Sequence, residues 1–233
     1  MSILFKNLKK LSIDLYINVE EEESIETIEN NKCLTHFTIF LYIYDSKSED
    51  AILRHMTALD QLVYLKISNR GKTIINVLRQ LSTKCLKIKS LSIESFDASS
   101  ALISSFVTQV KRFKRLERLG FHLFIQTYED FQPFNEYLKG MESLTHLSVD
   151  LVFGKHIEND LLKDIDICLP KLRVLCLRNF SLKVSEQTID SLGRLSTLQS
   201  LELNVNNIFI RESIVNKVEK NCKNIKTIIP LLY

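Results

Sequence analysis

Hydrophobic residues recur along this chain in a short pattern that returns every 26–28 residues. The pattern is L-x-x-L-x-L with conservative replacements, and successive copies begin 26, 28, 26, 28, 28, 28, 26 and 27 residues apart. The copies are Leu8-Leu11-Ile13, Leu34-Phe37-Ile39, Leu62-Leu65-Ile67, Ile88-Leu91-Ile93, Leu116-Leu119-Phe121, Leu144-Leu147-Val149, Leu172-Leu175-Leu177, Leu198-Leu201-Leu203 and a weaker Ile225-Ile228. This regularity predicts a repeat architecture in which each repeat packs mainly against its neighbours.

Two hydrophobic periods alternate within each repeat. The x-L-x-L-x part has period two, which predicts a strand buried on one face. Later in the repeat the apolar residues recur at three and four positions, which predicts an amphipathic helix over 51–59, 73–81, 101–110 and 213–222. Residues of good N-cap type precede such segments at Ser48, Asp97 and Ser185. Because every strand is followed by a helix, all strands should run the same way in one parallel sheet.

These repeats make the chain resemble the leucine-rich repeat family, over residues 8 to 229. The repeat length is similar to that of ribonuclease-inhibitor-like proteins and of the repeat regions of F-box proteins. The resemblance implies an α/β solenoid, or horseshoe, with a parallel sheet on its concave side and helices on its convex side. It also implies a single domain over residues 1–233, with about eight to nine repeats of 26–28 residues.

Cysteines ahead of the strands favour the F-box group within this family. Cys85-x-x-Ile88 and Cys222-x-x-Ile225 match its C-x-x-L opening, whereas Cys33 and Cys168 lie one or two positions off. The family's usual Asn or Cys, three positions after the last strand leucine, is mostly absent. That position holds Tyr16, Tyr42, Arg70, Phe96, Phe124, Val152, Phe180 and Asn206. The aromatic residues there predict a hydrophobic spine where the chain turns from sheet to helix.

Composition narrows the classes of function. The five cysteines are odd in number and contain no CxxC pair, which argues against a disulfide framework and a zinc site. The net charge of +3 does not indicate a nucleic acid or an anionic membrane as partner, and no apolar run is long enough for a membrane span. Motifs of hydrolases, zinc proteases and nucleotide-binding enzymes are missing. We therefore expect a cytoplasmic or nuclear protein that is not an enzyme and needs no cofactor or metal.

Alternate strand residues should point away from the core and form columns on the concave face, where solenoids of this kind bind their partners. The residues predicted to bind a protein partner are His36, Phe40, Tyr64, Lys66, Glu94, Arg118, His122, His146, Asp150 and Arg178. Glu94, His122 and Asp150 should be neighbours on adjacent strands, with Arg118 and His146 one column away. A histidine between two carboxylates would make a pH-sensitive or cation-seeking contact. A solvated ladder of charges that compensate one another is the alternative.

Two charged runs match the expected helix ends. Glu20 to Glu23 should open the first helical segment, and the basic cluster Lys111 to Arg115 should end the fourth. Both suit the helix dipole, so they predict solvated helix ends and not an interaction tail or a nucleic-acid site.

Three interpretations of function stay open. The first is the substrate-recognition module of an F-box ubiquitin ligase adaptor, which would contact cullin–RING ligase subunits through an F-box. The second is a regulatory or scaffold protein without ubiquitin chemistry, and the third is the repeat region of an immune receptor or pathogen effector. The strand pattern begins at Leu8, so the sequence holds no F-box and no evident N-terminal cap. Either it is part of a longer protein or its open end docks on something.

Overall fold

A computed structural model of the chain describes residues 8–17, 31–43, 56–69, 73–95, 100–125, 138–153, 162–178, 185–204 and 208–231. The chain divides into two compact units. The first comprises Met1–Asp97 with Leu102–Leu116, and the second comprises Ala98–Ala101 with Glu117–Tyr233. The single domain expected for the whole chain stays a prediction.

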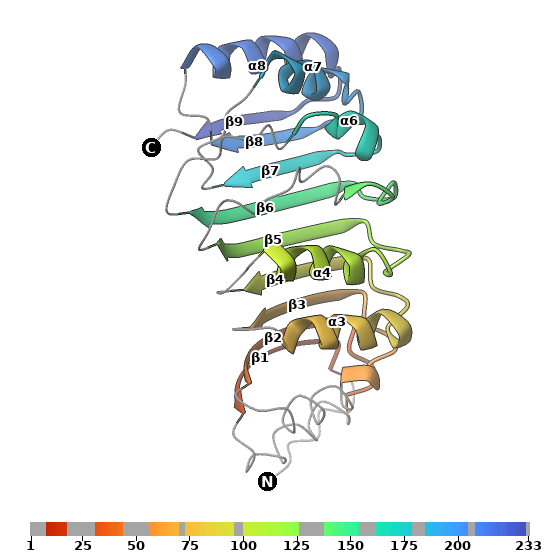
Figure 1. Ribbon diagram of the computed structural model, residues 1–233. Coiled ribbons are helices and arrows are strands. Elements are labelled where there is room, and N and C mark those ends of the chain that lie inside the picture. The colour runs from red at the N-terminus through yellow and green to blue at the C-terminus, as the bar shows by residue number, and fades with distance from the viewer. Residues whose placement is uncertain are drawn as a thin grey trace. The chain divides into compact units, whose positions relative to one another are not determined.

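The first unit contains four parallel strands that pair in sequence order. They are β1 (Lys10–Ile17), β2 (His36–Ile43), β3 (Tyr64–Asn69) and β4 (Ser90–Ser95). Helix α3 (Thr73–Lys84) follows β3 and lies over one face of these strands in Figure 1. Helix α4 (Ser100–Val110), most of which belongs to this unit, follows β4. The predicted helices over 73–81 and 101–110 are thereby confirmed.

The second unit repeats this arrangement with five parallel strands in sequence order. They are β5 (Arg118–Ile125), β6 (His146–Phe153), β7 (Val174–Arg178), β8 (Ser200–Asn204) and β9 (Thr227–Leu231). Its helices are α6 (Ile165–Cys168), α7 (Glu186–Arg194) and α8 (Ile208–Asn221). The helix predicted over 213–222 is therefore present but begins earlier, at Ile208. The predicted parallel α/β organisation is confirmed within each unit.

Helices α7 and α8 lie side by side at the C-terminal end of the second unit (Figure 1). They pack tightly at Gly193, where an added Cβ would lie 2.8 Å from Cγ of Lys217. The ammonium group of Lys217 lies 2.7 Å from Oδ1 of Asp190, so an exposed ion pair also links the two helices.

The strand register places equivalent repeat residues side by side. Leu65 pairs with Leu91 in the first unit, and Leu147 pairs with Leu175 in the second. These side chains are at most 1% exposed, as are Ile67 and most other pattern residues. The alternation of the strands has therefore placed the leucines in the core, where each buried side chain contributes about 1.5–3 kcal/mol.

A recurring turn leads into each described strand after the first. The backbone N–H of the first pattern residue donates to the carbonyl three residues earlier, as from Ile88 to Cys85 at 3.4 Å and from Ile225 to Cys222 at 3.0 Å. The residue that supplies this carbonyl is buried in every described copy. It is Asn31, Leu59, Cys85, Phe113, Met141, Leu169, Leu195 or Cys222.

The two C-x-x-L cysteines thus occupy a packing position that leucine, phenylalanine or methionine fills in other repeats. Their thiols lie 3.7 Å from the Met56 carbonyl and 3.2 Å from the Leu195 carbonyl, respectively. Cys33 is exposed, because Asn31 takes the buried position in its repeat. Cys168 is buried next to Leu169, one position away from the equivalent site.

One predicted cap is confirmed: the hydroxyl of Ser185 accepts from the backbone N–H of Thr188 at 3.2 Å at the start of α7. Ser48, Asp97, the Glu20–Glu23 run and the helical stretch 51–55 lie outside the described residues. The side chains of the predicted hydrophobic spine also lie outside what the structure describes.

Candidate protein-binding face

Each unit has a sheet face made by the strand residues that alternate with the buried leucines, and we call it the open sheet face. It is defined by His36, Thr38, Phe40, Tyr64, Lys66, Ser68, Ser90, Ser92 and Glu94 in the first unit, and by Arg118, Gly120, His122, His146, Ser148, Asp150, Val174, Cys176, Arg178, Ser200 and Glu202 in the second. Most of these residues are partly exposed, although Ser68 and Cys176 are buried. Because the strands are parallel and in register, equivalent residues line up in columns across each unit.

Two aromatic rings stack on the open sheet face of the first unit. His36 and Tyr64 are partners in the β2–β3 register, and their ring centroids lie 5.7 Å apart with the planes inclined at 22°. The Nδ1 atom of His36 lies 2.9 Å from the hydroxyl of Thr35, and this hydrogen bond fixes the orientation of the imidazole ring. This pair offers a flat, partly exposed aromatic surface of the kind enriched in protein interfaces.

Lys66 joins two other predicted residues on the same face. Its ammonium lies 2.6 Å from Oε1 of Glu94 and 5.6 Å from the ring centroid of Phe40. The side chains of Lys66 and Glu94 are 28% and 22% exposed, so the pair is neither fully solvated nor buried. Its contribution to folding is of the order of 1 kcal/mol or less. The five predicted site residues of this unit thus form two contact groups.

His122 and Asp150 meet in the second unit as the sequence predicts. They are partners in the β5–β6 register, and Nδ1 of His122 lies 2.9 Å from Oδ2 of Asp150. Asp150 is in turn the register partner of Arg178 on β7. Glu94 belongs to the first unit, where it binds Lys66, so its predicted contact with His122 stays a prediction.

Arg118 and His146 are register partners one column away from this pair. The pKa of His146 is lowered, chiefly because burial disfavours its charged form and further because Arg118 and Arg173 are nearby. Its Nδ1 lies 2.8 Å from the Thr145 hydroxyl. At neutral pH His146 is therefore an uncharged hydrogen-bonding group beside a cation.

A third group in this unit joins the predicted residue Arg178 to Cys176 and Glu202, which were not among the predicted binding residues. The guanidinium group of Arg178 donates two hydrogen bonds to the carboxylate of Glu202, from Nε to Oε1 at 2.7 Å and from Nη2 to Oε2 at 3.0 Å. The thiol of Cys176 donates to the same carboxylate at 3.0 Å. Cys176 and Glu202 are adjacent in the middle column, so their proximity follows from the repeat register, whereas the diagonal reach of Arg178 does not.

This geometry sets the protonation states of the group. Hydrogen bonding from Arg178 holds the pKa of Glu202 below its usual value. Burial, followed by the hydrogen bond to Glu202, raises the pKa of Cys176 to about 11. Cys176 is consequently a protonated thiol at neutral pH and a poor nucleophile.

Among the described residues, no three His, Cys, Asp or Glu side chains gather in a way that could hold a metal ion. The described helices include none with the length and apolar character needed to cross a membrane. Comparison with known proteins adds no family: no family model matches this chain, and neither does any curated protein.

Proposed function

We propose that this chain is a leucine-rich repeat protein that binds another protein through the open sheet face. The observation that carries the proposal is the in-register placement of stacked aromatic rings and partly exposed charged groups on that face. His36 and Tyr64 supply the aromatic surface, and Lys66 and Arg178 supply cations already oriented by acidic neighbours. Oriented side chains lose less conformational entropy when a partner binds, so they favour association.

The repeat assignment has its own support. The 26–28-residue period and the buried leucines are features that the family resemblance leads one to expect, and a turn of the same form precedes each described strand after the first. We further propose that the chain is not an enzyme. The protonated state of Cys176 and the pairing of Asp150 and Glu202 with cations or a histidine are consistent with a binding role.

Substrate recognition for a cullin-based ubiquitin ligase is the more specific proposal. Its support is the C-x-x-L opening at Cys85 and Cys222. The alternative is a regulatory or scaffold protein without ubiquitin chemistry. The alternative is favoured by the packing role of these cysteines, because Leu59, Phe113 and Met141 fill the same position in other repeats.

A crosslinking experiment tests the binding face. A photoreactive amino acid is placed at Ser92, on the open sheet face, or at Gln80, an exposed position of α3. Crosslinked proteins from native cells are then identified by mass spectrometry. We expect specific products from Ser92, their loss in a Tyr64→Ala, Lys66→Ala double variant, and no such products from Gln80.

Equal crosslinking from both positions, or products that persist in the double variant, would refute the assignment of the face. The same mass spectra separate the two finer proposals. Cullin-complex subunits recovered with the full-length protein would support ligase function, and their consistent absence would support the scaffold alternative.

A further inference from the structure

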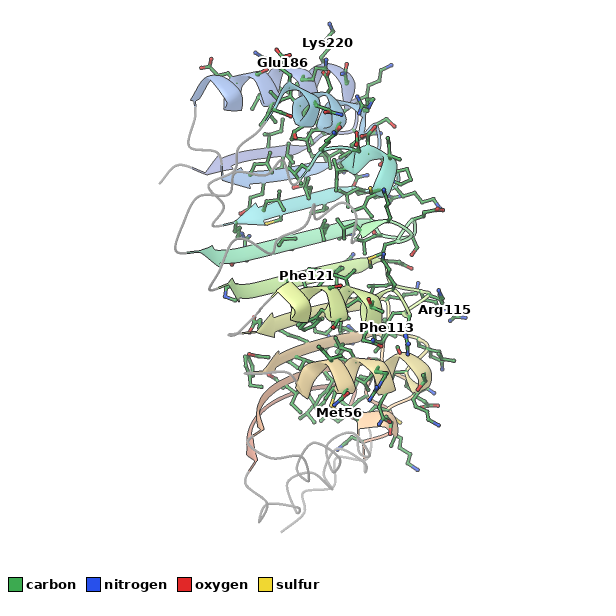
Figure 2. The ribbon with its side chains drawn as sticks, in the orientation of Figure 1. Met56, Phe113, Arg115, Phe121, Glu186 and Lys220 are labelled. Carbon is green, nitrogen blue, oxygen red and sulfur yellow. The ribbon has the colours of Figure 1, made fainter. Side chains whose placement is uncertain are left out.

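The edge of the first unit where strands begin carries a dense group of positive charges. Two successive stretches of this unit, residues 83–89 from the last turn of α3 onward and residues 111–116 directly after α4, contain no acidic residue. We call their cationic residues the basic edge: Lys84, Lys87, Lys89, Lys111, Arg112, Lys114 and Arg115. All are exposed except Lys111, which is half-buried. Figure 2 shows Arg115 extending away from the sheet at the end where the strands begin.

Helix dipoles account for only part of this charge. Both α3 and α4 end at this edge, and a helix C-terminus is equivalent to roughly half a negative charge. Two helices thus offset about one of the positive charges of the basic edge. The overall charge of +3 conceals this local excess, because most of the 28 acidic residues lie in other parts of the chain, and only Asp60 in the preceding turn and Glu117 directly after Leu116 flank the two stretches.

An exposed leucine lies within the basic edge. Leu86 is 65% exposed, because the turn directs its neighbours Cys85 and Ile88 into the core and leaves Leu86 outside. The equivalent positions of the other described repeats hold no comparable side chain. They are Lys32, Asp60, Lys114, Glu142, Pro170, Ser196 and Lys223. A large aliphatic side chain at a position otherwise polar or proline is not explained by the fold.

We propose that the basic edge is a docking surface for an acidic segment of a partner protein, with an apolar side chain of that segment resting on Leu86. Carboxylates would pair with the lysine and arginine side chains around it, which supplies charge complementarity and speeds association. Leu86 would lose its contact with water on binding, which supplies affinity that does not depend on charge.

A nucleic acid fits this surface less well. Phosphates would use the cations but leave Leu86 unexplained, and single strands bind best where exposed aromatic side chains stack on the bases. The one aromatic residue of the two turns, Phe113, is only 6% exposed. The proposal is independent of the function proposed for the open sheet face, because no basic-edge residue belongs to that face.

The test measures binding of a fluorescein-labelled synthetic peptide made only of glutamate, leucine and glycine, by fluorescence anisotropy with the full chain at low salt. A matched peptide has serine in place of leucine. We expect about a tenfold loss of affinity in Arg112→Glu, Arg115→Glu and roughly a fivefold loss in Leu86→Ser. The Leu86→Ser variant should bind the two peptides equally.

Control variants separate the basic edge from general charge and from the open sheet face. Lys220→Glu, Lys223→Glu reverses two exposed cations of the second unit, and Tyr64→Ala, Lys66→Ala alters the open sheet face. Both should leave peptide affinity within about twofold of the parent. Thermal unfolding of every variant verifies that its fold is retained.

Three outcomes would overturn the proposal. The first is no binding of the leucine peptide, and the second is equal affinity of the parent for both peptides. The third is that duplex RNA or phosphatidylserine vesicles bind more tightly than the leucine peptide and that Leu86→Ser does not change their affinity. A failure of crosslinking at Ser92 would leave these results unaffected, so the two proposals fail separately.

Discussion

Replacing one strand leucine tests whether the repeat pattern builds the core. Leu175 on β7 is fully buried between its register partners Leu147 and Leu201. Leu175→Ala removes three carbon atoms, worth about 2.4 kcal/mol at about 0.8 kcal/mol for each buried methylene. The cavity that remains adds to this loss, so we expect the free energy of unfolding to fall by about 3–4 kcal/mol.

The neighbouring residue on the same strand provides the control. Val174 points to the open sheet face and is half-buried, so Val174→Ala should cost less than about 1 kcal/mol. The free energy of unfolding is measured by urea titration, followed by far-ultraviolet circular dichroism. Hydrogen exchange should locate the damage of Leu175→Ala in β6, β7 and β8, because each repeat packs mainly on its neighbours.

The reasoning fails if the two variants lose the same free energy of unfolding. That result would mean that the strand does not separate a core face from an open face. Uniform loss of hydrogen-exchange protection across the second unit would contradict the local packing instead.

Three further predictions concern titratable groups. The pKa of His146 is lowered in the folded state, so the unfolded chain protonates first and the free energy of unfolding falls as pH drops below about 6.5. His146→Gln should remove this loss of stability from urea titrations carried out at a series of pH values, and an unchanged pH dependence would show that His146 is not its cause. Iodoacetamide should alkylate Cys33 first in the native protein, because Cys33 is exposed, whereas Cys85 is buried and burial raises its pKa to about 12. Peptide mapping of Cys33→Ser should show no rapidly alkylated cysteine, and rapid alkylation of Cys85 would refute its buried position. A double-mutant cycle with Arg178→Met and Glu202→Gln should give a coupling free energy of about 1 kcal/mol at pH 7, which is small because the Arg178 side chain is 53% exposed. The coupling should vanish in acid as Glu202 becomes protonated, and a coupling that stays unchanged in acid would exclude the ion pair as its source.

Sequence periodicity was sufficient to predict the strands and their register. A fixed repeat length places Leu147, Leu175 and Leu201 at equivalent positions, and parallel pairing of successive repeats then brings His122 to Asp150. The contact between His36 and Tyr64 follows from the same rule. Neighbours in a column are thus predictable, because they depend only on the backbone.

Contacts that depend on side-chain rotamers were not predictable from the repeat. Arg178 reaches diagonally to Glu202, and Lys66 turns toward both Phe40 and Glu94. Asp150 is the register partner of Arg178, yet the guanidinium group binds Glu202, because the choice of rotamer depends on local packing. Helix boundaries were also imprecise, as the early start of α8 at Ile208 shows.

The basic cluster Lys111 to Arg115 illustrates how the repeat can hide a surface from sequence reasoning. Taken alone, the run is accounted for by one helix end, and nothing in it points to a partner. Within the first unit, however, the preceding turn contributes Lys84, Lys87 and Lys89 to the same edge. The two turns are 28 residues apart in the chain, so a scan for runs of charge along the sequence treats them separately although the repeat brings them to the same edge. Charge in a repeat protein should therefore be compared between equivalent positions of successive repeats, where Leu86 stands out from polar or proline residues.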